Sequence, residues 1–228
     1  PAASEPDVRL AAGKPAEEAA KLMQAPEGFS VKLVAAEPDL HQPGGFCFDD
    51  RGRIWVLECF EYPRGQPVGQ KGKDRIRILQ DTDGDGKADV TKTFYEGLNL
   101  ATGIEVGYGG VFIGAAPHLL FIADANRDDV PDGEPEPLLS GFGRQDTHEL
   151  LNAFNWGPDG WLYGCHGVFT HSLVQDIKFS AAVWRYHPTT KKFEIFAEGC
   201  SNQWGVDFDD VGNAFITACV IPHLYHVI

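Results

Sequence analysis

Pairs of apolar stretches joined by short turns recur along the chain. In residues 148–164 (HELLNAFNWGPDGWLYG), an apolar run meets the turn Gly-Pro-Asp-Gly and leaves through a second apolar stretch. Two apolar runs around a tight turn predict a β-hairpin. The same unit occurs at 46–59, 104–116 and 206–219, so that the hairpins repeat about every 50 residues.

This period is typical of a four-stranded propeller blade, in which two weaker strands follow each inner hairpin. The predicted fold class is therefore all-β, a β-propeller. The expected strands are 46–48, 54–57, 75–79 and 91–95; 104–106, 111–113, 119–123 and 136–139; 151–156, 162–164, 183–187 and 193–196; and, in a fourth blade, a strand from 206 and another at 224–228. A complete ring of six blades would suit this inventory, so we expect the chain to cover roughly four blades.

The N-terminal part differs from the repeats. Residues 1–15 are rich in Pro, Ala and Glu and predict an arm without regular structure. Residues 16–24 predict a short helix, because Pro15 favours its start and Pro26 prevents its continuation. Residues 29–38 alternate as in a strand, which we expect at the outer edge of the last blade. We therefore divide the chain into an arm and helix, 1–25, and a partial propeller domain, 26–228.

Charge and hydropathy exclude several kinds of partner. The 228 residues carry a net charge of -14 and a pI near 4.9, which disfavours nucleic acid and anionic membranes. No stretch approaches the ~20 apolar residues of a membrane span, so we expect no membrane insertion. Because the chain starts at Pro1 without Met, we expect a signal peptide to have been removed and the protein to be periplasmic or extracellular. The five cysteines lack zinc spacing and predict either buried small side chains or one disulfide.

An acidic loop, DTDGDGKAD, separates the outer strands of the first blade. Its oxygen donors have the spacing of a calcium loop, in which Gly86 supplies the sharp turn. Strands flank it, and position 12 is Lys92 instead of the Glu of an EF-hand. The predicted Ca²⁺ ligands are Asp81, Asp83, Asp85, the Lys87 carbonyl and Asp89.

A second loop in the next blade, DANRDDVPD, repeats the spacing. Asp129 replaces the glycine of the turn, so an Asx-rich turn without metal is the alternative interpretation. The corresponding donors are Asp124, Asn126, Asp128, the Val130 carbonyl and Asp132. Both loops join third to fourth strands, and we expect them to be structural.

Four segments resemble known proteins: the hairpin 148–164, the acidic loop after RIRIL, the opening PEGFSVKLVAAEPDL and AEGCSNQWGVDFDDVGNAFIT. Together they resemble the N-terminal propeller of bacterial proteins called membrane-bound dehydrogenases, which often continue into helical repeats and a c-type haem domain. More distantly, the hairpin is similar to that of the PQQ-dependent soluble glucose and aldose-sugar dehydrogenases, which are six-bladed propellers. The resemblance implies PQQ as a cofactor, and a haem domain or missing blades as partners in the full-length protein.

A site can form where several connections reach one mouth of the propeller channel. These are the segments entering each inner strand and those joining second to third strands: 41–43, 99–102, 145–149, 201–203, 61–64, 166–171 and 222–223. In the sugar dehydrogenases a His before the Gly-Pro-Asp turn accepts the substrate hydroxyl proton, and His148 is the nearest match, one residue further from the turn. Asp146 is a candidate to orient its ring, and imidazole suits the role because its ordinary pKa is near neutrality. A structural His at a strand entrance is the alternative.

The resemblance also implies cofactor-binding residues. Asn202, followed by Gln203, matches the Asn of an Arg-Asn pair that holds PQQ, but the Arg position is Ser201. The carboxylates of PQQ require a cation, and Arg144 and Arg64 are the candidates to replace it.

Three functions are compatible with these features. The first is an extracytoplasmic, calcium-stabilised dehydrogenase module that oxidises a sugar-like hydroxyl or aldehyde at the channel mouth. The second is a non-catalytic calcium-binding propeller for a carbohydrate or protein. The third is a metal-dependent, lactonase-like hydrolase with Glu58 or Glu61, Asn99 and Asn202 around a channel cation.

Overall fold

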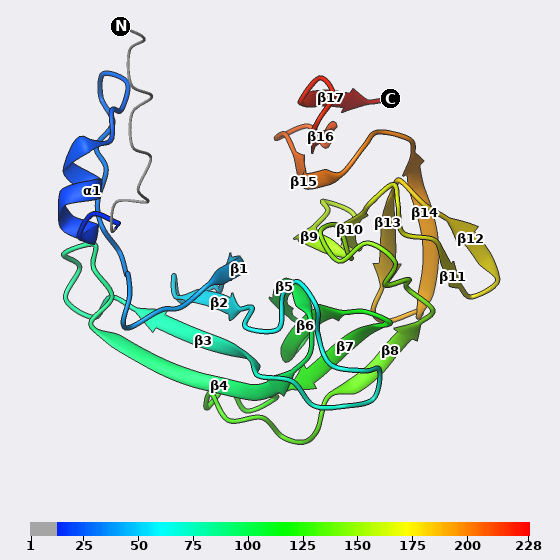
Figure 1. The fold of residues 1–228 in the computed structure, drawn as a ribbon, viewed down its shortest axis with the longest axis horizontal. Coiled ribbons are helices and arrows are strands. Elements are labelled where there is room, and N and C mark those ends of the chain that lie inside the picture. Colours follow the sequence, from blue (N-terminus) through cyan, green and yellow to red (C-terminus); the bar gives the residue numbers. More distant parts are fainter. Residues whose placement is uncertain (1–12) are drawn as a thin grey trace, which may run out of the picture.

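The computed structural model describes residues 13–228, and most of the predicted arm lies outside this range. Four antiparallel sheets follow one another along an arc in Figure 1, each with its strands in chain order from the inside outwards. The blades consist of β1 (Pro43–Phe48), β2 (Ile54–Glu58), β3 (Asp74–Gln80) and β4 (Val90–Leu98); β5 (Ala101–Gly107), β6 (Gly110–Ala115), β7 (His118–Ala123) and β8 (Glu136–Ser140); β9 (Asn152–Trp156), β10 (Leu162–His166), β13 (Ala182–His187) and β14 (Lys192–Glu198); and β15 (Gln203–Phe208), β16 (Ala214–Ala218) and β17 (Leu224–Val227). The predicted propeller of roughly four blades is confirmed.

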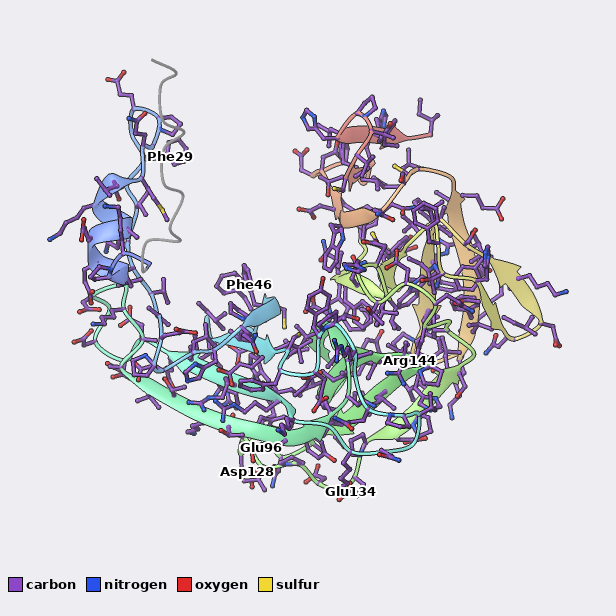
Figure 2. The ribbon with its side chains drawn as sticks, viewed as in Figure 1. Phe29, Phe46, Glu96, Asp128, Glu134 and Arg144 are labelled. Atoms are coloured by element: carbon purple, nitrogen blue, oxygen red, sulfur yellow. The ribbon has the colours of Figure 1, made fainter. Side chains whose placement is uncertain are left out.

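The blades pack together through equivalent positions on their innermost strands. Ile104 of β5 packs against the first blade and is 3% exposed, and Phe154 of β9 packs against the second and is 8% exposed. Gly103 makes room for Phe154, since a Cβ there would lie 2.7 Å from the ring. The equivalent Phe46 of β1 is 63% exposed and points towards the inner side of the arc, whereas Glu96, Asp128 and Glu134 lie at the outer rim (Figure 2). The core therefore consists mainly of layers between successive blades.

The helix α1 (Ala16–Leu22) ends two residues before the predicted end at residue 24. Met23 already has an extended backbone, and none of the helical residues is buried. No tertiary packing therefore stabilises a further turn of this helix, and the helix propensity of the residues alone is too weak to extend it. Within residues 13–228 no helix is long and apolar enough to span a membrane.

The predicted strand at 29–38 is wrong. This segment joins no sheet of the described chain; apart from local turn bonds, its one backbone hydrogen bond to another described segment runs from Ala88 N–H to the Val34 carbonyl, at 2.9 Å. The Lys32 ammonium also donates to the Asp85 carbonyl, at 3.2 Å. A strand requires a ladder of such bonds with a neighbour. The segment instead runs against the acidic loop at 81–89.

A further hairpin, which the sequence analysis missed, interrupts the third blade between β10 and β13. It consists of β11 (Ser172–Val174) and β12 (Ile177–Phe179), joined by Gln175 and Asp176 at φ of 47° and 66°. Its first residue, Ser172, is hydrogen-bonded to the fully buried His166 ring at 2.7 Å. Burial lowers the pKa of His166 to about 4, so this hairpin is anchored on a neutral imidazole.

All five cysteines lie in the described part of the chain and are free thiols. Cys47 and Cys165 are buried between blades, as expected for small apolar side chains, whereas Cys219 is exposed. The alternative of one disulfide is therefore not observed.

Candidate functional site

A cavity of about 290 Å³ lies where the segments entering the inner strands meet. It combines residues from the entrances of all four blades with Tyr62 from the connection between β2 and β3. The lining residues are Gln42, Pro43, Gly44, Cys59, Tyr62, Thr102, Thr147, His148 and Trp204. We refer to this space as the His148 cavity.

His148 and Asp146 form a pair at this cavity. The His148 Nδ1 lies 2.9 Å from Asp146 Oδ1, which also accepts the His148 backbone N–H at 3.0 Å. Burial alone would raise the pKa of Asp146, but the hydrogen bonds from His148 lower it below its ordinary value. An ionised Asp146 holds the proton of the neutral ring on Nδ1. The Nε2 atom is then a free acceptor on a side chain that is 70% exposed.

Two aromatic side chains line the same cavity as His148. The Tyr62 ring meets the His148 ring edge to face, with centroids 5.7 Å apart and planes at 87°. Trp204, just after the predicted segment 201–203, contributes a second, partly exposed aromatic surface. Sequence reasoning did not single out these two residues, although both belong to or follow segments expected at the channel mouth. Their apolar faces suit one side of a sugar ring, whose C–H groups form a similar face.

A buried carboxyl group lies directly after His148. Glu149 is 1% exposed; its Oε1 accepts from the Asn152 amide at 2.9 Å, and its Oε2 has no hydrogen-bond partner among the described residues. The side chain packs on Gly167, where a Cβ would collide with it. Burial raises the pKa of Glu149 to about 8. This carboxyl group is therefore mostly protonated at neutral pH.

The predicted cofactor-binding residues do not line the His148 cavity. Arg144 donates to the Gln66 carbonyl at 3.1 Å, and Arg64 is exposed. The Gln203 amide donates to the Gly199 carbonyl at 2.8 Å. The Asn202 backbone carbonyl accepts from Cys219 N–H at 3.0 Å, whereas its buried side-chain Oδ1 has no hydrogen-bond partner among the described residues. The cavity lining contains no Lys or Arg. PQQ carries carboxylates that need such a partner, so the lining of the His148 cavity does not fit PQQ.

Three of the four residues of the lactonase alternative, Glu58, Glu61 and Asn99, have other hydrogen-bond partners. Glu58 is fully buried and accepts hydrogen bonds from the Arg75 guanidinium and the His41 backbone. Glu61 accepts from the Gln66 amide at 2.8 Å, and Asn99 exchanges hydrogen bonds with the Gln66 backbone. These side chains fix the connection between β2 and β3 instead of converging on a channel cation.

The first acidic loop brings three carboxylates together. Oxygen atoms of Asp81, Asp83 and Asp89 all lie within 4.8 Å of one another. Backbone N–H groups of Gly86 and Gly84 donate to Asp81 at 2.7 Å, and the first of these contributes most to lowering the pKa of Asp81. Exposed, ionised oxygen donors at this separation fit Ca²⁺. Asp85 is not part of this group, and its carboxylate accepts the Lys87 N–H at 2.7 Å.

The second acidic loop shows no comparable convergence among the described residues. Asp124 accepts N–H groups of Asp128 and Asp129, Asp128 accepts that of Val130, and Asp132 accepts that of Ala125. The Asn126 amide donates to Asp128 at 3.0 Å. At the position of the missing glycine, Asp129 forms ion pairs with Arg53 and Lys92. Backbone amides and cations therefore already hold this loop.

Gly44 gives a direct test of the packing at the His148 cavity. A Cβ at this position would collide with the Cys59 sulfur, which itself donates to the Ala101 carbonyl at 2.8 Å. We expect Gly44→Ala to lower the free energy of unfolding by about 1–3 kcal/mol, measured by urea denaturation. The matched control is Gly133→Ala, because no atom would lie within 4 Å of its Cβ. Equal stability of the two variants would contradict the packing described.

Known proteins with similar structures are propellers. The chain superposes on a gluconolactonase from Xanthomonas campestris with a TM-score of 0.58 at 15% identity, covering 86% of this chain and 60% of the other. For the PQQ domain of a pyranose dehydrogenase from Coprinopsis cinerea the TM-score is 0.63 at 14% identity, covering 90% and 51%. For regucalcin, a calcium-binding protein from Agrobacterium tumefaciens, the TM-score is 0.51 at 11% identity, covering 78% and 53%. The chain thus spans between half and three fifths of each of these proteins, and the likeness establishes the fold.

The sequence itself matches one family. No curated protein matches the chain. In contrast, residues 15–228, which include all four blades and the His148 cavity, match the family described as Domain of unknown function (DUF7133). The chain therefore belongs to the DUF7133 family.

Proposed function

We propose that the His148 cavity oxidises a hydroxyl or aldehyde group of a sugar-like substrate, within an extracytoplasmic propeller module that is stabilised by calcium. The observation that carries this proposal is the His148–Asp146 pair, which leaves Nε2 free in a cavity flanked by Tyr62 and Trp204. The similarity to the gluconolactonase and pyranose dehydrogenase propellers supports a sugar-type substrate. These two proteins have different activities, so the similarity does not select the reaction.

The chain's own residues would supply proton transfer and orientation. With its proton held on Nδ1 by Asp146, His148 can accept the proton of a substrate hydroxyl at Nε2. As the carbonyl forms, the hydrogen on carbon leaves as hydride to a two-electron acceptor. Because no Lys or Arg lines the His148 cavity, this cavity by itself does not supply the cation that the carboxylates of PQQ need. The acceptor would be bound by the remainder of a longer protein, and a c-type haem domain there would receive the electrons.

The test is a dye-linked oxidation assay over a panel of aldoses and sugar alcohols. It should be run on the full-length protein with and without added PQQ and Ca²⁺. Turnover of at least one sugar is the expected result. Saturable sugar binding without turnover under every condition would contradict oxidation and favour the second function, a carbohydrate-binding propeller. The uncharged lining of the cavity, which would not repel a neutral sugar, is compatible with that alternative.

We propose that the first acidic loop is the calcium site, with Asp81, Asp83 and Asp89 as ligands. The loop separates β3 from β4, so a cation there would restrain the outer strands of the first blade. Ca²⁺ that binds only the folded protein raises its stability by mass action.

Asp83→Ala should remove most of the rise in Tm that Ca²⁺ produces. At 100 times the dissociation constant the expected stabilisation is about 2.7 kcal/mol, and removing one of three converging carboxylates should eliminate most of it. Calorimetry with and without chelator measures the effect. The matched control, Asp128→Ala in the second loop, should retain the calcium response. A calcium-dependent Tm that persists in Asp83→Ala would place the cation elsewhere.

A further inference from the structure

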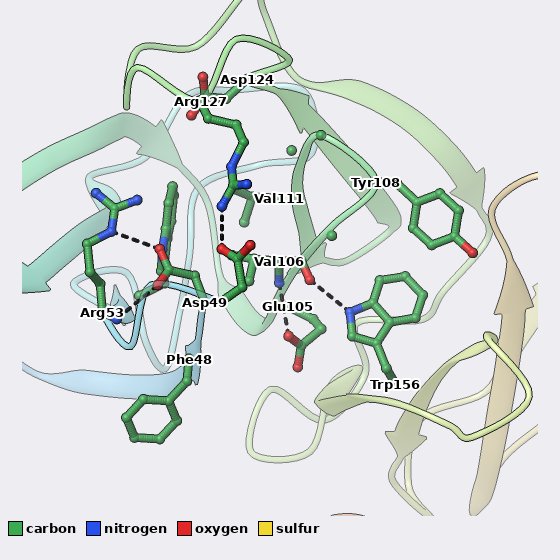
Figure 3. A pocket seen from close by; sticks show the side chains of 15 residues that line it. Phe48, Asp49, Arg53, Glu105, Val106, Tyr108, Val111, Asp124, Arg127 and Trp156 are labelled. Atoms are coloured by element: carbon green, nitrogen blue, oxygen red, sulfur yellow. Dashed lines mark hydrogen bonds and ion pairs between the residues drawn. The ribbon is translucent and has the colours of Figure 1, made fainter.

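A second cavity, of about 390 Å³, lies at the other end of the inner strands. Its walls come from the turns between β1 and β2 and between β5 and β6, from Asp124 and Arg127 of the second acidic loop, and from Trp156 at the end of β9 (Figure 3). The His148 cavity instead lies where the inner strands begin. Inner strands of about six residues at ~3.3 Å each separate the two ends by roughly 20 Å. The second cavity is therefore a distinct site.

Aromatic rings form one wall of this cavity. Tyr108 lies over Trp156 with ring centroids 5.2 Å apart, and its hydroxyl approaches the Gly160 carbonyl at 3.4 Å. Tyr108 is 56% exposed and occupies the first position of a two-residue turn at φ 53°. Asn, Asp or Gly is preferred in that conformation, and a bulky residue there is strained. Such strain commonly accompanies a functional side chain.

Glu105 supplies a carboxyl group to the same cavity. The residue is 8% exposed, and one of its oxygen atoms accepts the Val106 N–H at 3.0 Å. The other oxygen has no hydrogen-bond donor among residues 13–228. The Trp156 indole cannot serve, since its N–H donates to the Val106 carbonyl at 2.8 Å. The carboxyl group therefore retains an acceptor for a ligand.

The charges around the cavity determine the kind of ligand. Arg53 is paired with Asp49 at 2.8 Å and with Asp129, and Arg127 is paired with Asp50. Both cations of the lining thus already have carboxylate partners, whereas Glu105 has no cationic partner. A partly buried carboxylate without a countercharge favours a cationic ligand over a neutral or anionic one.

We propose that this cavity binds a small organic ammonium ion, with the rings of Tyr108 and Trp156 against the cation and the Glu105 carboxylate as its counterion. Aromatic faces attract ammonium groups through their quadrupoles, most strongly when water is excluded. A carboxylate beside the rings adds a charge-assisted hydrogen bond or a direct ionic attraction. This site lies apart from His148 and does not depend on the proposed oxidation.

Binding is tested with choline and n-butylammonium as cationic probes. The neutral comparisons are 3,3-dimethyl-1-butanol and n-butanol, which match the probes in shape, and glucose controls for stacking of a sugar. Because burial raises the pKa of Glu105 to about 7, the titrations are made near pH 8.5. Calorimetry should show that at least one cation binds tenfold or more tightly than its neutral match.

Glu105→Gln, which keeps the shape of the side chain, should weaken binding of that cation at least tenfold. Tyr108→Ala, at an exposed turn, should also weaken it. His148→Gln at the other cavity should leave it unchanged. Equal affinities for cation and neutral match, tighter binding of glucose, or unchanged affinity in folded Glu105→Gln would each overturn the proposal. If Glu105→Gln does not fold, the affinity of Tyr108→Ala for the cation is compared with that of the wild type instead, and an unchanged affinity would overturn the proposal.

Discussion

Replacing His148 with Gln should lower the rate of sugar oxidation by roughly 10²–10⁴-fold, the usual contribution of a general base. Gln keeps hydrogen-bonding capacity but cannot accept a proton near neutral pH. The side chain is largely exposed and buries little area, so the Tm and calcium binding should change little. The dye-linked assay on the full-length protein measures the effect as kcat/KM for the sugar that is turned over.

Two further variants distinguish catalysis from structure. Asp146→Asn should also lower the rate strongly, because the Asn amide can donate to Nδ1 and so place the ring proton on Nε2, which removes the acceptor for the substrate proton. His171→Gln, an exposed histidine that does not line the His148 cavity, should leave the rate unchanged. If His148→Gln keeps full turnover, or loses turnover only because it unfolds, His148 is not the base.

Glu149→Gln should stabilise the protein at pH 8 by on the order of 4 kcal/mol and change its stability little at pH 4.5. In the folded protein burial raises the pKa of Glu149 from 4.5 to about 8. The folded state thus binds this proton more tightly than the unfolded chain does. Its contribution to stability is complete below pH 4.5 and is lost as the pH rises towards 8. Gln keeps the shape without titrating, so the variant avoids this loss.

Urea denaturation at several pH values between 4.5 and 8 measures the effect. The difference between wild type and variant isolates Glu149 from the other buried groups, among them His166 and Glu105. Glu27→Gln, at an exposed position, is the control and should show no pH-dependent difference. A constant difference between Glu149→Gln and wild type across this range would mean that Glu149 is ionised in the folded protein.

The inner hairpins were predictable because local chemistry determines them. In the third blade, the turn 157–160 is closed by a backbone hydrogen bond from Gly160 N–H to the Gly157 carbonyl. The equivalent turn of the first blade begins with Asp49, whose carboxylate accepts the N–H groups of Arg51 and Arg53. The strand at 29–38 has a comparable alternation but no neighbouring strand in the described chain. Alternation of apolar and polar residues shows that a segment could form a strand, but the segment becomes one only if another strand lies beside it to pair with.

The hairpin β11–β12 was missed for the opposite reason. Its strands have three residues each, and Gln175 and Asp176 adopt the left-handed turn without a glycine to indicate it. Tertiary contacts, including that between His166 and Ser172, hold it in place. Long-range packing also determined the burial of Glu149 against Gly167. By contrast, Asp146 and His148 lie two residues apart, so their pairing was visible in the sequence.

The layered contacts between blades also determine how the molecule should unfold. Each innermost strand packs on the next, β1 on β5, β5 on β9 and β9 on β15. Stability in such an array is approximately a sum of blade terms and nearest-neighbour interface terms. Among the described residues, the two middle blades have a neighbour on each side, whereas β15–β17 have one, so the following expectation applies to residues 13–228 studied on their own. Amide hydrogens in the fourth blade should therefore exchange with solvent through partial opening, at a free energy well below that of global unfolding, while β6 and β10 remain protected.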